Sequence, residues 1–404
     1  MSVRRKILLG ISAMICLAFV LLIGRLLLVS AFDPIRTDHG YSLEAYSLEN
    51  FPIISHQFAG RRNTPNLSIL RNYRHLTNPG SEDISGERFS FYVYHDAMGA
   101  RVNVPDSIPP KTIDFVACGE SSSWGFGLPN EKTYVSLIEK ELGLKGANVS
   151  SIGATPLQCY FLLRDSLEYG VKMLIFYFWE EYYSSSIARC VNAHSPVCVP
   201  HPYLVPDENA GFRVVLPDNP ERDLNLWRLY DIETQGGPET TFLTDLFWRY
   251  YQSKTDLLER FETRSRFASP HNRPYSSEKI SAMNHILGML RQLTEENEVN
   301  LIVAYIPFWS NDPSYLSKLS PETEAYMREN GIVFTNLSDD FNALKQQEKQ
   351  FHFADGHLNA TGHSLVASKI IDTGLLQRME SSEKNQFAPP IAAPVEKIIR
   401  ENLP

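Results

Sequence analysis

The feature that most constrains the fold of this chain is a series of short apolar runs that alternate with helical patterns between residues 113 and 371. The runs lie at residues 113–118, 173–178 and 301–306, and a fourth starts at residue 332. Each is too short for a helix and fits a strand that is buried on both faces. Strands separated by helices form a parallel sheet that helices cover on both sides. We therefore predict a three-layer α/β/α domain over residues 111–377.

Three segments between these runs carry apolar residues at helical spacing. The clearest covers residues 277–296, and the others cover residues 133–142 and 361–371. The alternation breaks over residues 184–275, which are dense in proline, asparagine and charged residues before a helical stretch. We predict that this segment is an insertion or cap over the carboxyl edge of the sheet.

The segments outside the domain show no such alternation. Residues 33–110 are polar, aromatic and without a helical period, and we expect them to pack on the domain as a juxtamembrane extension. Residues 378–404 are polar and then rich in proline, which is typical of a loosely ordered tail.

A long apolar stretch at the N-terminus predicts a membrane anchor at residues 7–32. Residues 7–24 carry no charge, and the apolar character resumes after Arg25. A helix needs about 20 such residues to span a bilayer. The basic run at positions 4–6 keeps residues 1–6 in the cytoplasm by the positive-inside rule. We expect a single-pass protein whose main domain lies outside the cytoplasm.

The alternative for this stretch is a cleaved signal peptide. Val29, Ser30 and Ala31 resemble a small-residue cleavage site. The apolar region is longer than the roughly 7–15 residues usual in signal peptides, which favours the uncleaved anchor.

The cysteines agree with an exported domain. Cys118 and Cys159 fall in apolar segments, and we predict buried thiols there. Cys190 and Cys198 flank a short loop that contains proline, and in an oxidising compartment we expect a disulfide between them.

Composition excludes two classes of protein. Hydrophobic residues make up 43% and charged residues 21%, close to a globular average, which excludes wholesale disorder. The net charge of -9 argues against nucleic acid as the main partner, because phosphate binding needs a basic surface. His194 and His201 lie near the cysteine loop, but their spacing matches no zinc site. We predict no metal and no other cofactor.

Two polar motifs lie at the ends of this alternating region. Gly119, Glu120 and Ser121 follow the first predicted strand, and Asp355 and His357 precede the last predicted helix. Ligands bind at the carboxyl edge of open α/β sheets, where we expect both motifs. Serine is a weak nucleophile until a base takes its proton, and an imidazole does so best when a carboxylate fixes its tautomer.

These motifs resemble the sequence blocks of the SGNH/GDSL hydrolases, in particular their membrane-anchored, exported bacterial members. The family's first block, Gly-Asp-Ser-x-Thr-x-Gly, is similar to residues 119–125, and its last, Asp-x-His-x-Asn-x-x-Gly-His, matches residues 355–363. An Asp-x-x-Gly-Phe-Arg segment often seen upstream is similar to residues 96–101.

The resemblance covers about residues 90–375 and implies a flavodoxin-like SGNH fold. By this resemblance Ser121 is the nucleophile, His357 the base and Asp355 the residue that orients the base. His363 closes the last block, and we expect it to be a structural residue packed on the final helix.

The oxyanion hole follows from the middle blocks. Residues 153–158 resemble the family's glycine block, so Gly153 is expected to donate its N–H together with that of Ser121. A register that places Pro156 at the donor position would abolish this donor, since proline has no N–H.

The family's Gly-x-Asn-Asp block, whose Asn donates to the oxyanion, is replaced here by Phe-Trp-Glu-Glu at residues 178–181. We expect Gln158 to stand in for that Asn, and the alternative is that Gln158 merely starts the next helix. Trp124 and Trp179 are candidates for substrate-binding platforms, with core positions as the alternative.

The resemblance implies a membrane-tethered serine esterase or O-acyltransferase. Its expected substrates are small acyl esters or ester-bearing, possibly acetylated, glycans that are exported or at the cell surface. The rival hypothesis is a degenerate, non-catalytic SGNH domain that binds glycan or scaffolds an envelope assembly, and the missing Asn favours it.

Overall fold

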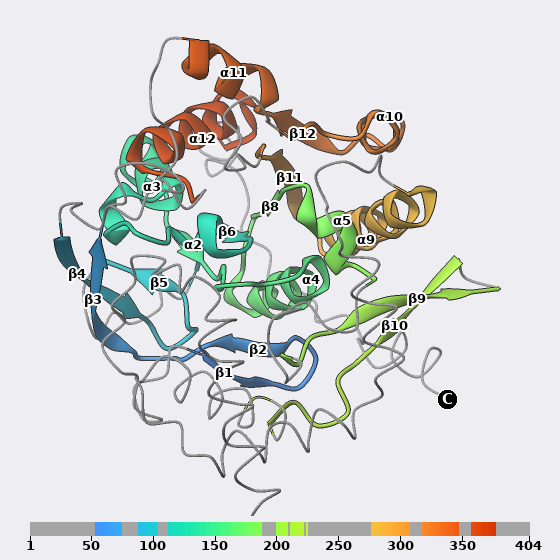
Figure 1. Ribbon diagram of the computed structural model, residues 1–404, viewed down its shortest axis with the longest axis horizontal. Helices are drawn as coiled ribbons and strands as arrows, with labels where there is room; N and C mark the ends of the chain where they lie inside the picture. Colours follow the sequence, from blue (N-terminus) through green and yellow to red (C-terminus); the bar gives the residue numbers. More distant parts are fainter. Residues whose placement is uncertain are drawn as a thin grey trace, which may run out of the picture.

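A mixed sheet of eight strands forms the centre of the computed structural model (Figure 1). The structure describes residues 53–74, 88–103, 112–187, 199–208, 211–221, 224, 276–307, 317–346 and 357–376. The sheet has the order β12-β11-β8-β6-β7-β5-β4-β3. Its strands are β3 (Ser68–Arg74), β4 (Arg88–His95), β5 (Arg101–Val102), β6 (Phe115–Cys118), β7 (Gly146–Asn148), β8 (Met173–Phe178), β11 (Asn300–Tyr305) and β12 (Val333–Asn336).

Five neighbouring strands of this sheet, from β12 to β7, pair in parallel. Numbered along the chain they lie in the order 2-1-3-4-5, which is the flavodoxin-like arrangement. The four predicted strands correspond to β6, β8, β11 and β12, so the prediction of an α/β domain with a parallel-rich sheet is confirmed. The prediction missed β7, because Gly-Ala-Asn is too short to form an apolar run.

The other strands, β5, β4 and β3, extend the sheet through antiparallel pairs. They lie within residues 68–102, which the sequence assigned to a separate extension. The predicted domain boundary at residue 111 is therefore wrong, because the central sheet continues through residues upstream of it. These strands mix polar and apolar residues and so give no buried-strand pattern.

Helices cover both faces of the sheet. They are α3 (Tyr134–Leu142), α4 (Pro156–Ser166), α9 (Ser277–Glu296), α10 (Pro321–Glu329), α11 (Ser338–Gln346) and α12 (Ala360–Asp372), with the short α2 (Ser121–Trp124) and α5 (Glu181–Ser185). Alternate residues of β8 face opposite layers. Leu174 and Phe176 pack with residues of α4 and α9, whereas Ile175 and Tyr177 pack with residues of α3 and α12. Burial of both faces explains why β8 is one continuous apolar run.

Two small hairpins lie beside the main sheet. One is formed by β1 (Ile53–His56) and β2 (Gly60–Asn63), and the other by β9 (Tyr203–Asp207) and β10 (Gly211–Val215). The second belongs to the predicted insertion, most of which lies outside the described residues.

The predicted anchor at residues 7–32, the tail at 378–404 and the predicted Cys190–Cys198 disulfide also lie outside the described residues. Within the part of the chain that the structure describes, no helix combines the length and apolar character needed to cross a membrane.

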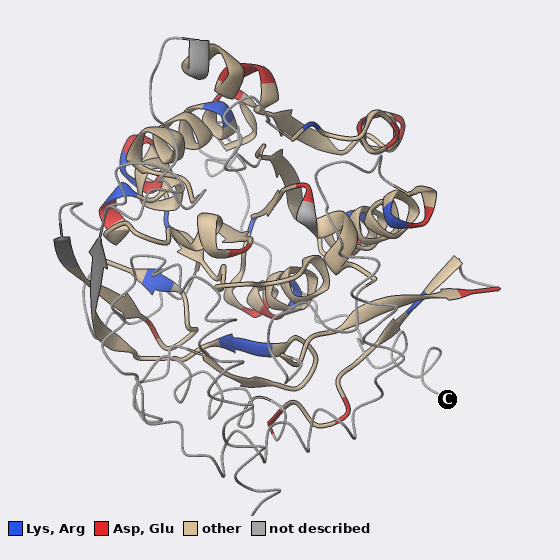
Figure 2. Cartoon of the chain, viewed as in Figure 1, with Lys and Arg blue, Asp and Glu red and all other residues tan. Residues whose placement is uncertain are grey.

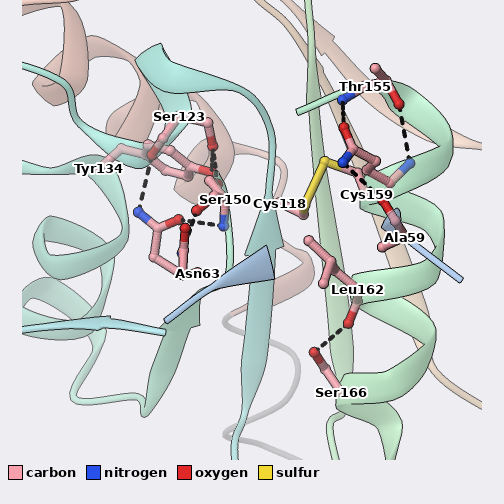
Figure 3. The surroundings of a disulfide bond; sticks show 12 residues. Ala59, Asn63, Cys118, Ser123, Tyr134, Ser150, Thr155, Cys159, Leu162 and Ser166 are labelled. Atoms are coloured by element: carbon pink, nitrogen blue, oxygen red, sulfur yellow. Dashed lines mark hydrogen bonds between the residues drawn. A yellow bond between two sulfur atoms is a disulfide. The ribbon is translucent and has the colours of Figure 1, made fainter. Parts of the chain in front are cut away.

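A disulfide joins Cys118 at the end of β6 to Cys159 in α4 (Figure 3). Both residues are fully buried, as predicted, but the prediction of free thiols is wrong. Cys118 points toward the layer that contains α4, and the two Cα atoms are 5.4 Å apart, within the range that a disulfide spans. The bond ties the strand that leads into Ser121 to the helix that follows Gly153.

We predict that replacing Cys118 and Cys159 together by Ala lowers the free energy of unfolding by about 2–4 kcal/mol, because the bond closes a long loop in the unfolded chain. The two residues are 41 positions apart in sequence. Urea unfolding of the full chain in detergent measures the change, with Cys16→Ala in the predicted anchor as the control. Peptide mapping without reductant that finds both cysteines alkylated contradicts the bond itself.

Candidate active site

Ser121 stands in a tight turn where β6 ends and α2 begins. Glu120 is the N-cap of α2, and its carboxylate accepts a hydrogen bond from the Ser122 N–H at 2.9 Å. Gly119 is needed for this turn, because a Cβ there would lie 2.5 Å from the Cβ of Ser123. The helix ends at Gly125, whose φ of 90° is in the left-handed region that glycine adopts at low cost.

The His357 imidazole reaches Ser121 from the far end of the sequence. Its Nε2 lies 2.8 Å from Ser121 Oγ, across a sequence separation of 236 residues. His357 precedes α12, whose N-cap Asn359 accepts a hydrogen bond from the Gly362 N–H. The Phe126 ring stacks on the imidazole with centroids 4.4 Å apart, which fixes the plane of the ring. The structure thus brings the predicted nucleophile and base into hydrogen-bond contact.

Asp355, the predicted partner of His357, lies outside the described residues. Its role in orienting the imidazole stays a prediction. Glu120 contributes a second contact that the sequence did not suggest. The Ser121 hydroxyl donates to Glu120 Oε2, so the predicted nucleophile touches a carboxylate as well as the imidazole.

The loop between β7 and α4 runs beside the turn at residues 119–125 that carries the predicted nucleophile, which we call the nucleophile turn. The Ser151 N–H donates to the Gly119 carbonyl at 3.2 Å, and the Ala154 N–H folds back onto the Ser151 carbonyl. Gly153 has a φ of 65°, a conformation that favours glycine. Among the described residues, the N–H groups of Ser121 and Gly153 donate to no other group. This leaves them available as donors, as the resemblance implies.

Gln158 does not fit the role expected of it. Its Oε1 accepts from the Thr155 N–H at 2.9 Å, and Thr155 in turn caps α4 by accepting from the Gln158 N–H. Its Nε2 donates to the Ala59 carbonyl at 2.9 Å. The alternative of a helix-starting residue is what the structure shows, because both ends of the amide are engaged by backbone. Pro156 is likewise the first residue of α4 and not part of the glycine turn.

The two tryptophans lie in different surroundings. Trp124 is only 1% exposed, so the prediction of a substrate platform is wrong for this residue and its alternative, a core position, holds. Trp179 is half-buried against the core on the α4 side, and its role in substrate binding stays a prediction.

Arg101 holds the nucleophile turn from the side of the antiparallel strands. Its Nη1 donates to the carbonyls of Trp124 and Gly125 at 2.6 and 2.7 Å, and its Nη2 donates to that of Leu128. The guanidinium also lies over the Trp124 ring, 4.4 Å from its centroid. Figure 2 shows β5 as a basic segment in the interior, and Arg101 is only 3% exposed. The backbone carbonyls compensate this buried charge.

The turn before Arg101 explains the spacing of its motif. The Asp96 carboxylate accepts hydrogen bonds from the N–H groups of Met98 and Ala100, and burial raises the pKa of this carboxyl above its ordinary value. Gly99 has a φ of 78°. Sequence resemblance singled out this motif, but its contact with the nucleophile turn was not predicted.

A buried hydroxyl network surrounds Ser123, two residues after Ser121. The Ser123 hydroxyl contacts those of Tyr134 and Ser150 at 2.8 and 2.7 Å (Figure 3). Asn148 donates to the Ser123 carbonyl, and Asn63 donates to the Ser150 carbonyl. Burial raises the pKa of the Tyr134 phenol well above its ordinary value, so the phenol stays protonated as a donor.

His363 is the structural residue that the sequence predicted. It is fully buried on α12, and its Nδ1 accepts from the Tyr134 N–H at 3.1 Å. Burial, with a contribution from the Arg101 charge, lowers the pKa of His363 to about 3.

Comparison with known proteins adds little to this geometry. No family model and no curated protein matches the sequence. Among solved structures, the protein YxiM from Bacillus subtilis is similar at 9% identity with a TM-score of 0.34, over 80% of this chain and 77% of that chain. An acetyl xylan esterase, Est2A, from the rumen bacterium Butyrivibrio proteoclasticus is similar at 10% identity with a TM-score of 0.29, over 83% and 97% of the two chains. At these TM-scores the likenesses carry no argument about function, which rests on the geometry of the site.

The buried His363 predicts how stability depends on pH. Its folded-state pKa is below the ordinary 6.5, so its contribution is fully present above pH 6.5 and is lost as pH falls toward 3. We expect His363 to account for a loss of about 2 kcal/mol of unfolding free energy between pH 7 and pH 5. Urea unfolding of wild type and His363→Gln at both pH values measures this loss, because the variant has no imidazole at position 363 to become protonated. Equal losses in the two proteins contradict the prediction.

Proposed function

We propose that this chain is a serine hydrolase of ester bonds, with Ser121 as nucleophile and His357 as base. The 2.8 Å contact between Ser121 Oγ and His357 Nε2 is the observation that carries the proposal. The pair lies where the sheet order reverses around β6 and at the carboxyl ends of the strands, the usual place for a ligand in such folds.

The reaction follows from these groups. Neutral His357 accepts the Ser121 proton as Oγ attacks the ester carbonyl. The N–H groups of Ser121 and Gly153 donate to the oxyanion that forms. His357 then returns the proton to the leaving alcohol as the C–O bond breaks, which leaves an acyl group on Ser121. Asp355 is proposed to hold the imidazole in the tautomer that accepts at Nε2.

The acceptor of the acyl group distinguishes an esterase from an O-acyltransferase. Water activated by His357 gives hydrolysis, and a sugar hydroxyl in the same place gives transfer. The substrates we propose are acyl esters, in particular acetyl esters, of exported or cell-surface glycans. This choice follows the resemblance to exported SGNH hydrolases, with the half-buried Trp179 as a candidate contact for the sugar.

A non-catalytic glycan-binding or scaffolding domain is the second candidate. Two observations favour it. Glu180 stands where an Asn donor is expected, and the Ser121 hydroxyl donates its one proton to Glu120 and not to the base.

We propose that the domain works outside the cytoplasm, tethered by residues 7–32. The apolar stretch behind a basic run supports this orientation. The Cys118–Cys159 disulfide supports it independently, since disulfides persist in oxidising compartments.

We predict that Ser121→Ala and His357→Ala each remove nearly all hydrolysis of an aryl acetate, about 10³-fold or more, and that the double variant loses little further. Residues that act as one unit are strongly non-additive. The measurement is turnover of the full chain in detergent, together with labelling by a fluorophosphonate probe. Ser364→Ala, an exposed serine on α12, is the matched control. A wild-type protein that neither turns over nor labels favours the binding domain.

The orientation has its own test. Reporter fusions at the C-terminus should be active only with a reporter that works outside the cytoplasm. A second fusion, in which the basic residues at positions 4–6 are replaced by Glu, should lower that signal, because the positive-inside rule then loses its cue. Activity of a cytoplasmic reporter alone refutes the orientation.

A further inference from the structure

One side of β2 follows the loop that carries Gly153. The Ala59 carbonyl, just before β2, accepts from Gln158, and two residues later Arg61 Nη2 donates to the Gly153 carbonyl. Two residues further, Asn63 Nδ2 donates to the Ser150 carbonyl at 2.8 Å. Alternate residues of a strand share a face, so Arg61 and Asn63 lie on one face of β2, and that face contacts the loop at Gly153 and Ser150.

Arg61 is the central contact of this face. It is 5% exposed, so its guanidinium is held inside the protein. A Cβ on Gly153 would lie 2.9 Å from Arg61 Nη2, and any other residue there would push the guanidinium away. The left-handed φ of Gly153 therefore favours glycine at this position, and a Cβ would also displace the guanidinium from its contact.

Holding the Gly153 carbonyl sets the conformation of the residue. On its C-terminal side the Ala154 N–H is bonded to the Ser151 carbonyl, and the Ser151 N–H is bonded to Gly119 beside the nucleophile. The Gly153 N–H belongs to the preceding peptide plane, so its direction depends on the φ and ψ of Gly153. The turn closed between Ala154 and Ser151 and the Arg61 contact hold these angles together. A donor aimed in advance at the developing charge stabilises the transition state more than one that must reorganise.

We propose that Arg61 is a positioning residue that aims the Gly153 N–H at the oxyanion and adds a buried positive charge behind it. The inference rests on the proposed hydrolase function. In the family that the chain resembles, an Asn side chain helps to stabilise the oxyanion. The inference assigns part of that stabilisation to the hairpin of β1 and β2. With Glu180 in the place of that Asn, the two backbone N–H groups are the donors proposed for the oxyanion, and the direction of each matters more.

The test compares Arg61→Met and Arg61→Lys with Arg62→Met in the full chain. Arg62 is the matched control, because it is the next residue of β2, points to the opposite face and is half-buried. We expect Arg61→Met to lower kcat about 10- to 100-fold with KM unchanged within about 3-fold, since the lost effect is on the transition state. Arg61→Lys should fall between, because it keeps the charge without the planar fork.

Two further measurements distinguish a loss of Gly153 N–H orientation from a loss of folded protein. The rate of fluorophosphonate labelling should fall in parallel with kcat, because phosphonylation of Ser121 also develops charge on an oxygen. In Arg61→Ala, millimolar guanidinium should restore part of kcat, whereas it should not affect Arg62→Ala. A purely structural role predicts losses that follow the unfolded fraction and no rescue.

The outcomes are distinguishable. A folded Arg61→Met protein with wild-type kcat and labelling rate overturns the inference and leaves the proposed function standing. A wild-type chain with no turnover and no labelling at Ser121 overturns both. If neither neutral variant folds, Arg61→Lys decides: a kcat lowered by about 3-fold or more at unchanged KM supports the inference, and a wild-type kcat overturns it.

Discussion

Burial of both faces of the central strands is the constraint on which the rest of this structure depends. Each of β6, β8 and β11 must offer apolar side chains above and below, so helices are required on both sides of the sheet. The crossover connections then run parallel strands in one direction, and all their carboxyl ends meet at one edge. The sheet order reverses next to β6, which is the place where ligands bind in open α/β sheets. Ser121 and His357 meet there although most of the chain separates them.

This constraint also explains what the sequence could predict. The buried strands and the approach of His357 to Ser121 were readable, because both depend on runs and motifs at strand and helix ends. The positions of the Trp124 and Gln158 side chains could not be predicted, because they depend on which residues each side chain contacts in the folded protein. The Cys118–Cys159 bond depends on how α4 crosses β6. The strands β3 to β5 mix polar and apolar residues, so no apolar run marked them.

Two buried arginines show how the upstream segment serves the site. Arg101 binds the carbonyls that end the nucleophile turn, and Arg61 binds the carbonyl of Gly153. A guanidinium inside a protein must find several acceptors, and turns with free carbonyls offer them. The carbonyls that accept from each buried guanidinium are thereby held in a fixed geometry. These two arginines upstream of the predicted boundary at residue 111 therefore belong to the architecture of the site.

Glu120 provides a second hydrogen-bond partner for the Ser121 hydroxyl, in addition to His357. The Ser121 hydroxyl carries one proton, and both a carboxylate oxygen and an imidazole nitrogen lie within reach of it. When His357 Nε2 bears a proton, the hydroxyl can accept from it and give its own proton to Glu120. When His357 Nε2 bears none, the hydroxyl can turn toward it, which is the arrangement that the proposed mechanism needs. Rotation of a single hydroxyl hydrogen separates the two arrangements, with no movement of the backbone.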